Sequence, residues 1–415
     1  MNVVDIPAVQ RRTLSLLFAT QIIGGIGVAI GIAVGALLAA SMGGTGISGL
    51  ASSSSVVGAA LLAIPATRLI RHRGRRPGLV FAYTCGVLGA MVVVTAVKIG
   101  SVALLFAGMA LFGGGNTANL QARYAAVDLA APARRGRQLS LIVWATTIGA
   151  VAGPNVAPLA DRYARRSGLP EYTGPFVFSA LAFGVVALAI MVVLRPDPLL
   201  VARGTAGEAS SVASAGLRDA VRAVRSEPAA RLGISAVAVG HVVMVAVMSM
   251  TPVHIGGYVH GDVLRVVGLV LSLHIGGMYA LSPVVGWLTD RLGRRPVILG
   301  GVATLLLACA VAGTAGHHTA RLATGLALLG LGWSATMVAG STLLSESVGT
   351  VVRPAVQGLS DLAMGLAGAV AGALSGLVVS WSSYPTLTLL AAIATVPLIA
   401  LASRTVPALA MSEGS

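Results

Sequence analysis

Charged and aromatic residues are scarce in this chain. Only 10% of its 415 residues are charged, 4% are aromatic, and cysteine occurs twice, as Cys85 and Cys309. Both cysteines lie in apolar segments, so we interpret them as small packing residues in preference to a disulfide or a thiolate site. We find no nucleophile triad, phosphate-binding loop or carboxylate pair in a polar domain, so the sequence does not indicate an enzyme.

Apolar residues dominate instead, at 56% of the chain and a mean hydropathy of +0.89. This composition is typical of all-α membrane proteins, whose spanning helices need about 20 apolar residues each. The 53 glycines would let such helices approach closely. The first apolar stretch is too long for the core of a signal peptide. We predict twelve transmembrane helices at residues 13–40, 47–69, 77–98, 101–126, 138–160, 174–194, 232–255, 264–287, 296–315, 320–344, 355–380 and 385–403.

The net charge of +15 is explained by its placement, and it does not indicate binding to nucleic acid. With both termini in the cytoplasm, 28 − 6 = 22 basic residues fall on the inner side. This asymmetry follows the positive-inside rule and indicates a bacterial cytoplasmic (inner) membrane protein, with the lipid bilayer as its surroundings. The basic inner surface would attract anionic lipids. The six outer basic residues are Lys98, Arg162, Arg165, Arg166, Arg265 and Arg321.

The longest polar segment, 195–231, divides the chain into two bundles, 1–194 and 232–415. Apolar and basic residues alternate with helical spacing near its end, which fits a short amphipathic helix on the inner surface. A solvated linker with weak helicity fits this segment as well. The residues in question are Leu217, Val221 and Val224 with Arg218, Arg222 and Arg225.

The two halves repeat with one offset. The sequence Gly-Arg-Arg-Pro at 74–77 recurs at 293–296, so the offset is 293 − 74 = 219. The same offset relates Gln138 to Gln357 and Gly149 to Gly368. Because one offset fits a loop and a helix far apart, we infer that a six-helix unit was duplicated into two pseudo-symmetric bundles.

The sequence from Gly286 to Arg295 resembles the G-x-x-x-D-R-x-G-R-R loop motif of the major facilitator superfamily. The resemblance implies the major facilitator fold and a conformational latch between the bundles. The first-half copy is degraded, because Arg71 stands where the motif has its Asp. We expect Arg71 to pair with Asp361, the one acid inside an apolar helix, unless Asp361 titrates during transport or is simply favoured by the helix dipole. The predicted latch comprises Asp290, Arg291, Gly293, Arg294, Arg295, Arg71, Asp361, Asp128 and Glu346.

The fifth predicted helix carries Gly149, Gly153 and Pro154. This pattern resembles the G-x-x-x-G-P motif of major facilitator exporters that couple drugs to protons. Glycine permits close packing and proline can bend a helix, so the motif predicts a packing face and hinge. It also leaves open a proton-coupled exporter or importer of a small organic solute or drug.

Soft metal-binding side chains occur inside two neighbouring predicted helices. Met244 and Met248 are four residues apart, as are His274 and Met278, so each pair lies on one helix face. His241 shares the face of the first pair. Both sets fall near the bilayer midplane, and thioether plus imidazole suits copper(I). Methionine is also a common packing residue, and a lone histidine can bond a neighbouring helix.

The two motifs together resemble those of the CcoA-type copper importers, which are major facilitator proteins. That resemblance implies copper(I) as the imported substrate. We expect no prosthetic group, and we expect cytoplasmic copper chaperones as partners. A copper-binding membrane protein that senses the metal or assists oxidase assembly without transport is the other alternative. His260, His317 and His318 in predicted outer loops either collect metal or have no role.

Overall fold

The computed structural model describes residues 5–130, 135–206, 216–349 and 352–403, and they form helices without any strand. The helices are α1 (Ile6–Gly43), α2 (Thr45–Arg73), α3 (Arg75–Ile99), α4 (Val102–Ala125), α5 (Arg135–Arg166), α6 (Gly174–Val193), α7 (Pro198–Ala206), α8 (Leu217–Ser226), α9 (Pro228–Gly256), α10 (Val263–Tyr279), α11 (Ser282–Leu292), α12 (Arg294–Gly313), α13 (Thr319–Glu346), α14 (Arg353–Trp381), α15 (Tyr384–Ile393) and α16 (Val396–Ser403).

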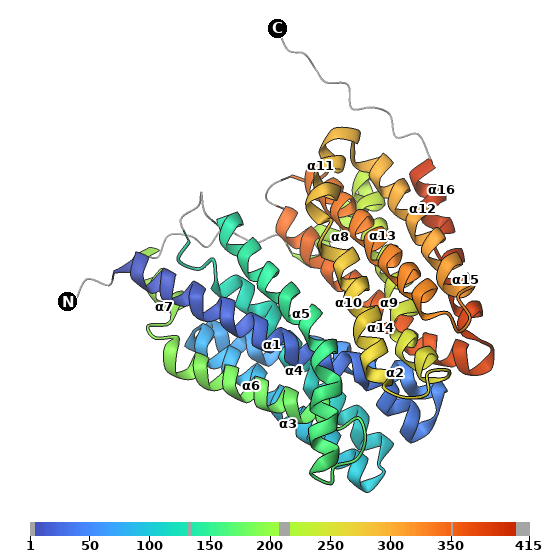
Figure 1. Ribbon diagram of the computed structural model, residues 1–415. Helices are drawn as coiled ribbons and strands as arrows, with labels where there is room; N and C mark the ends of the chain where they lie inside the picture. The colour runs from blue at the N-terminus through green and yellow to red at the C-terminus, as the bar shows by residue number, and fades with distance from the viewer. Residues whose placement is uncertain (1–4, 131–134, 207–215, 350–351, 404–415) are drawn as a thin grey trace.

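Twelve membrane crossings account for this arrangement, as the hydropathy pattern predicts. Among the described residues, ten helical stretches are long and apolar enough to cross a membrane. The 24-residue α4 and the 32-residue α5 supply the other two. In Figure 1 the chain from α1 to α6, blue to green, forms one bundle, and the yellow-to-red helices from α9 onward form a second. The fold class inferred from the sequence is therefore confirmed.

Two predicted helices are each broken into two shorter ones. The span at 264–287 becomes α10 and α11, and the span at 385–403 becomes α15 and α16. Pro283 and Pro397 lie at the second residue of the helices that follow the breaks. Proline has no N–H to donate and its ring clashes with the preceding turn, so each helix restarts at the proline.

The polar segment between the bundles forms α7 and α8, and the expected amphipathic helix corresponds to α8. Val224 and Ala220 are buried against Leu344 and Val356 of the second bundle. Leu217 is exposed instead of buried. The sequence pattern thus located this helix, and it did not indicate α7.

The two ends of the bundles differ. We call the end where α1 begins and α16 ends the terminus side, and the end with the turns at 44, 167–173 and 257–262 the loop side. Contacts between the bundles concentrate toward the loop side, where α2 packs on α14 and α5 on α10. A Cβ added at Gly49 would overlap the carbonyl oxygen of Gly372, so the two backbones nearly touch there.

Hydrogen bonds reinforce this contact. Ser53 of α2 donates to the Ala369 carbonyl of α14 at 2.6 Å, and Asn155 of α5 donates to Ser272 of α10 at 2.5 Å. Ser53, Ala369 and Asn155 lie in the halves of their helices nearer the loop side, and Ser272 lies next to the middle of α10. The described residues therefore show the bundles joined at the loop side.

Candidate functional site

His274 is the most enclosed of the predicted metal-binding side chains. It is 0% exposed, and its Nδ1 lies 2.8 Å from the carbonyl oxygen of Leu326 on α13. A carbonyl only accepts hydrogen bonds, so Nδ1 carries the hydrogen and a neutral ring keeps a lone pair on Nε2. Nε2 is buried and has no hydrogen-bond partner. Its lone pair is therefore unused in the structure.

Close packing fixes the orientation of His274. A Cβ added at Gly330 of α13 would overlap the backbone carbonyl of His274, and one at Gly277 would overlap that of Ala327. Small residues thus bring α10 and α13 to backbone contact. The histidine ring is held between them, and its carbonyl partner is the kind of outer-shell group that orients metal-binding imidazoles.

The predicted methionines belong to the same apolar core cluster, which is formed largely by the second bundle. Met244 and Met278 are buried, and Met248 packs against the cluster from its edge. No group of three or more His, Cys, Asp or Glu side chains that could hold a metal occurs in the described residues. A metal at this place would therefore rely on thioethers, which favour copper(I).

His241 occupies a different environment. Its Nδ1 accepts a hydrogen bond from the indole N–H of Trp333 at 3.2 Å, because indole nitrogen only donates. The other face of the ring approaches Gly368 of α14, where an added Cβ would lie 2.8 Å from Nε2. Tyr279 packs edge-on against Trp333 with ring centroids 6.0 Å apart. His241 thus joins an aromatic group, and the nitrogen that accepts from Trp333 is not free for a metal.

The charged side chains near this aromatic group come from both bundles. Arg123 near the end of α4 interacts electrostatically with Asp361 of α14 and with Tyr279. The ion pairs among the described residues include none between Asp361 and Arg71. The predicted ion pair between Asp361 and Arg71 is therefore absent from the described residues. The charge that acts on Asp361 is that of Arg123, which the sequence did not indicate.

Polar residues in the first bundle bond one another across helices. Gln21 of α1 donates to the Asn119 carbonyl of α4 at 3.2 Å and to Thr146 of α5 at 2.9 Å. Tyr83 of α3 donates to the Asn119 side chain at 2.7 Å. These buried groups join four helices of the first bundle.

The repeated Gly-Arg-Arg-Pro loops each form a two-pronged ion pair. Arg75 contacts Asp128 at 2.8 and 3.0 Å, and Arg294 contacts Glu346 at 2.6 and 2.9 Å. Both carboxylates were predicted as latch residues, and Arg294 was too, whereas Arg75 was not. Each pair ties the start of one helix to the end of the next within its own bundle.

The other predicted latch residues lie around the second loop. Asp290 lies 3.6 Å from Arg294, and the Arg291 guanidinium lies 5.1 Å from the Trp287 ring centroid. Gly293 has φ +91°, which glycine adopts readily, so it can turn the chain between α11 and α12. Arg295 is partly buried at the start of α12. Their role as a latch in other conformations stays a prediction.

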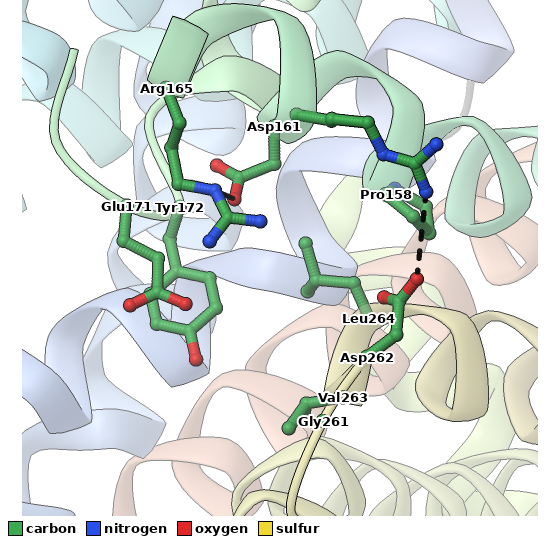
Figure 2. Close-up of a pocket in the computed structure, with 10 residues that line it drawn as sticks. Pro158, Asp161, Arg165, Glu171, Tyr172, Gly261, Asp262, Val263 and Leu264 are labelled. Atoms are coloured by element: carbon green, nitrogen blue, oxygen red, sulfur yellow. Dashed lines mark ion pairs between the residues drawn. The ribbon is translucent and has the colours of Figure 1, made fainter. Parts of the chain in front are cut away.

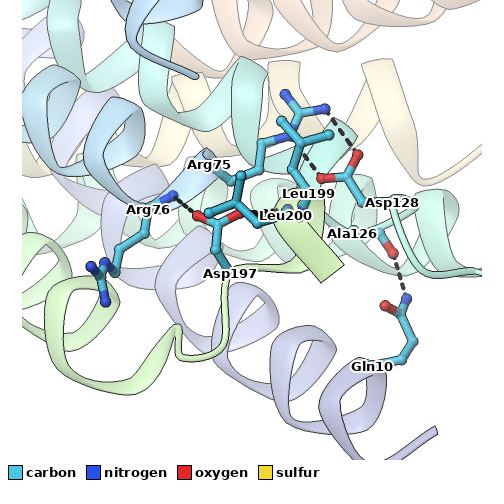
Figure 3. Close-up of polar contacts among 8 residues, drawn as sticks. All are labelled: Gln10, Arg75, Arg76, Ala126, Asp128, Asp197, Leu199 and Leu200. Carbon is cyan, nitrogen blue, oxygen red and sulfur yellow. Dashed lines mark hydrogen bonds and ion pairs between the residues drawn. The ribbon is translucent and has the colours of Figure 1, made fainter. Parts of the chain in front are cut away.

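Asp197 is a terminus-side residue that the sequence did not single out (Figure 3). It accepts from the backbone N–H of Arg76 at 2.8 Å and of Leu199 at 3.0 Å, so it caps the starts of α3 and α7 together. A Cβ at Gly74 would lie 2.5 Å from its carboxylate. Gln10 of α1 donates nearby to the Ala126 carbonyl at 2.7 Å. The first-half loop, which lacks the motif's Asp, thus contacts a carboxylate from after α6.

The glycine motif of α5 lies where this helix approaches α1. A Cβ at Gly149 would lie 2.5 Å from the Ile22 carbonyl, and one at Gly153 would lie 2.7 Å from Ala29. Pro154 faces the other way, since its carbonyl lies 2.8 Å from a Cβ added at Gly268 of α10. The two glycines of the motif therefore pack on α1 within their own bundle, and the proline of the motif contacts α10 of the second bundle. A hinge motion there stays a prediction.

A loop-side pocket of about 200 Å³ lies between the bundles (Figure 2). Arg162 of α5 forms an exposed ion pair at 4.0 Å with Asp262, which caps α10. On the first-bundle side, burial raises the pKa of the Tyr172 hydroxyl, and Glu171 adds to this effect. The pocket belongs to the closed side of the molecule and contains none of the predicted metal-binding residues.

Comparison with known proteins places the whole chain among transporters. The family model described as Major Facilitator Superfamily matches residues 13–264 and 254–411. The uncharacterized MFS-type transporter YdeG of Bacillus subtilis is 39% identical, and the match covers 94% of this chain and 91% of that protein. The riboflavin transporter RfnT of Brucella anthropi is 24% identical over 94% of this chain and 95% of its own length.

Solved structures agree on the fold. The nucleoside transporter NupG (D323A mutant) matches with a TM-score of 0.73 at 15% identity, covering 95% of this chain and 98% of that one. A bacterial homologue of the human lysosomal transporter Spinster, in an inward-facing and unoccupied conformation, gives 0.69 at 14% identity, covering 95% and 96%. At these identities the likeness shows the fold and leaves the cargo open.

Proposed function

The chain belongs to the Major Facilitator Superfamily and is a multi-pass membrane transporter, and we propose that it imports copper(I) across the bacterial cytoplasmic membrane. The site comprises Met244 and Met248 of α9 with His274 and Met278 of α10. His241 stands at its edge, toward the aromatic group. Copper(I) is the cargo here, and both termini lie in the cytoplasm, where copper chaperones would receive the ion.

One observation carries the proposal. His274 is fully buried, its Nδ1 is committed to Leu326, and its Nε2 has no partner. A buried polar atom without a partner is costly, so such an atom in a membrane helix needs an explanation. Met244 and Met278 lie in one apolar core cluster, and their soft thioethers are the companion ligands that we propose for copper(I). A neutral site also binds weakly enough to release the ion.

Uptake of radioactive copper(I) into proteoliposomes tests the proposal. We expect His274→Ala and Met248→Leu to reduce uptake at least tenfold, as losing one ligand or outer-shell group commonly does. The matched controls are His72→Ala and Met91→Leu, since both residues are exposed and lie outside the site. Unchanged uptake in both site variants would remove copper from the proposal. Uptake by intact cells without uptake by proteoliposomes would favour the sensing or assembly alternative.

A second candidate is the proton-coupled transport of a small organic solute. The grouping of Trp333, Tyr279 and His241 beside Arg123 and Asp361 favours it, since aromatic faces and opposite charges bind organic molecules. Two similar proteins named above carry riboflavin and nucleosides. This candidate predicts that Trp333→Leu abolishes uptake of the organic solute while Met248→Leu leaves it intact.

A further inference from the structure

The acids that the structure describes on the loop side all line one pocket. Asp161 lies near the end of α5, Glu171 in the turn after it, and Asp262 at the start of α10. They come from both bundles, and in Figure 2 Glu171 and Asp262 lie on opposite sides of the pocket. Arg162 and Arg165 share its walls. A group of acids is not in itself a binding site, so the partners of each side chain decide what the pocket can hold.

Asp161 is buried, and one of its two carboxylate oxygens has no partner. The residue is 2% exposed, and its Oδ2 lies 3.2 Å from Nε of Arg165. Its Oδ1 is buried and accepts no hydrogen bond from the described residues. The backbone N–H groups of Tyr172 and Gly174 act on this carboxylate, but neither has hydrogen-bond geometry with Oδ1. A buried acceptor without a donor is costly, so this atom indicates a ligand that supplies the donor.

The backbone of Tyr172 is strained beside this acceptor. Its φ is +64°, and it is the one residue other than glycine with a positive φ in the part of the chain that the structure describes. Residues with side chains rarely adopt this conformation, and those that do cluster at ligand sites, where packing holds them. Tyr172 packs against the apolar clusters of both bundles, which keeps the neighbouring Glu171 at the pocket.

The pocket has one negative charge more than it neutralises. Arg165 pairs with Asp161, and Arg162 pairs with Asp262. Glu171 takes part in none of the ion pairs among the described residues. The unmet groups are therefore a carboxylate charge and a buried acceptor. A ligand that satisfies both has one positive charge and carries hydrogen-bond donors.

A primary ammonium group has these properties, because it has three N–H donors, no acceptor and a single charge. A calcium ion needs about six to eight oxygen ligands, and the two guanidinium groups would repel its double charge. A quaternary ammonium group has the charge but no N–H for Oδ1. The pocket volume of about 200 Å³ corresponds to roughly seven waters at about 30 Å³ each, so the ligand is small.

We propose that the loop-side pocket binds a small primary amine in its ammonium form, held by Asp161, Glu171 and Asp262. The ring of Tyr172 at the pocket adds its attraction for a cation. An amine bound there contacts both bundles and so favours the state in which the loop side is closed. The pocket contains none of the residues proposed for copper(I), so either proposal can fail without the other.

Equilibrium dialysis with ¹⁴C-ethanolamine tests this binding. The protein is held in phosphatidylcholine nanodiscs at neutral pH, where the amine is protonated and the lipid headgroups carry no ammonium N–H. We expect saturable binding at one site per chain. Unlabelled ethanolamine should displace the label, whereas choline, which differs by three methyl groups on the nitrogen, should not. The absence of saturable binding, or displacement by choline or Ca²⁺ as effective as that by ethanolamine, overturns the proposal.

A second set of nanodiscs contains phosphatidylethanolamine, whose headgroup ends in the same ammonium group. Weaker apparent binding of ¹⁴C-ethanolamine in these nanodiscs identifies the lipid headgroup as an occupant of the pocket. Equal binding in both sets identifies a soluble amine as the ligand.

Substitutions place the bound amine in the pocket. Asp161→Asn should weaken binding at least about tenfold, because it removes a charge-assisted hydrogen bond. Glu171→Gln and Asp262→Asn should each weaken it severalfold, and they test the two walls even if Asp161→Asn does not fold. Asparagine at 262 can still cap α10. The control Asp5→Asn, at the exposed start of α1 on the terminus side, keeps its cap and should bind as the wild type does.

Arg165→Gln separates a cationic ligand from an anionic one. This change frees Oδ2 of Asp161 and makes the pocket more negative, so binding of ethanolamine should be retained or become tighter. Loss of binding in Arg165→Gln would mean that the arginine itself holds the ligand, and the proposal would be wrong. It would also be wrong if Glu171→Gln and Asp262→Asn both bound ethanolamine with wild-type affinity.

Discussion

The two bundles share a backbone plan but differ in chemistry. Subtracting the offset of 219 places α9 (Pro228–Gly256) on 9–37 within α1, and the α10–α11 stretch (Val263–Leu292) on 44–73, which is α2 with one residue more. The same holds for α12 on α3, α13 on α4 and α14 on α5. One offset therefore fits five consecutive crossings.

Several side chains inside the bundles that carry polar chemistry are not repeated. His241, Met244 and His274 correspond to Ile22, Gly25 and Ser55 in the first bundle, and Tyr83 and Asn119 correspond to Val302 and Val338 in the second. What the halves have in common is the packing of small residues and the Arg-Arg loop. The first bundle contains a network of hydrogen-bonded side chains that includes Tyr83 and Asn119. The second bundle contains histidine, methionine and tryptophan side chains instead. The repeat thus specifies the scaffold, and departures from it indicate the functional sites.

The largest difference in unfolding free energy between matched variants of the two bundles should come from the two loop ion pairs. Arg75 and Asp128 have side chains only 14% and 10% exposed, whereas Glu346 is 51% exposed beside Arg294. Asp128→Ala leaves a largely buried guanidinium unpaired, so we expect a loss of about 3 kcal/mol of unfolding free energy. Glu346→Ala should lose about 1 kcal/mol or less. Unfolding in mixed micelles, followed by tryptophan fluorescence, measures both, and equal losses would contradict the contrast.

The repeated glycines Gly149 and Gly368 should also differ in how much unfolding free energy their replacement by alanine costs. A methyl group at Gly149 meets the backbone of α1, which cannot yield, while one at Gly368 meets the His241 ring, which can rotate. We expect Gly149→Ala to cost about 2 kcal/mol of unfolding free energy and Gly368→Ala less than about 1. Gly368→Ala should also change Trp333 fluorescence, because His241 accepts its indole hydrogen bond. The reverse order of cost in the same unfolding assay would refute this.

The hydrogen bond from Tyr83 to Asn119 has no equivalent in the second bundle. Tyr83→Phe removes the donor and leaves the buried Asn119 oxygen without it, so we expect a loss of about 1 kcal/mol of unfolding free energy. Val302→Ala at the matching position removes only apolar volume and serves as the comparison. If Tyr83→Phe is neutral while Asn119→Val alone destabilises, the network does not depend on this bond.

The smallest expected effect concerns Arg291 and Trp287 in the second loop. Their counterparts in the first loop are His72 and Arg68, so the cation–ring contact is present in one half only. Arg291→Gln should cost about 0.5 kcal/mol of unfolding free energy, the usual size at an exposed site. His72→Gln should cost nothing measurable. A loss above 2 kcal/mol for Arg291→Gln would mean that this residue does more than cover the ring.

Much of the fold could be predicted from the sequence, because hydropathy and the offset both depend on local residue order. An apolar run about 20 residues long identifies a transmembrane helix without any knowledge of the helices that pack against it. The breaks before Ser282 and Val396 were missed, although Pro283 and Pro397 mark them. A proline inside an apolar run can bend or restart a helix, and the run itself does not say which.

Long-range partners were harder to foresee. Spacing on one helix places His241 with Met244, but it does not show that Trp333 takes its Nδ1 or that Leu326 takes that of His274. Charge order likewise suggested Arg71 for Asp361, whereas the fold brings Arg123 toward it from another helix. Such pairings depend on how the helices cross, which local patterns do not encode.

The backbone contact between Gly49 and Gly372 is a point about which the two bundles can rotate, and residues far along α14 move most in such a rotation. Asp361 lies eleven residues from Gly372 on the same helix, or about 16 Å along its axis. Rocking by about 10° around this pivot would swing Asp361 through roughly 3 Å, about the length of one hydrogen bond. A small tilt at a fulcrum made of two glycines is therefore amplified into a displacement large enough to make or break an electrostatic contact at the far end.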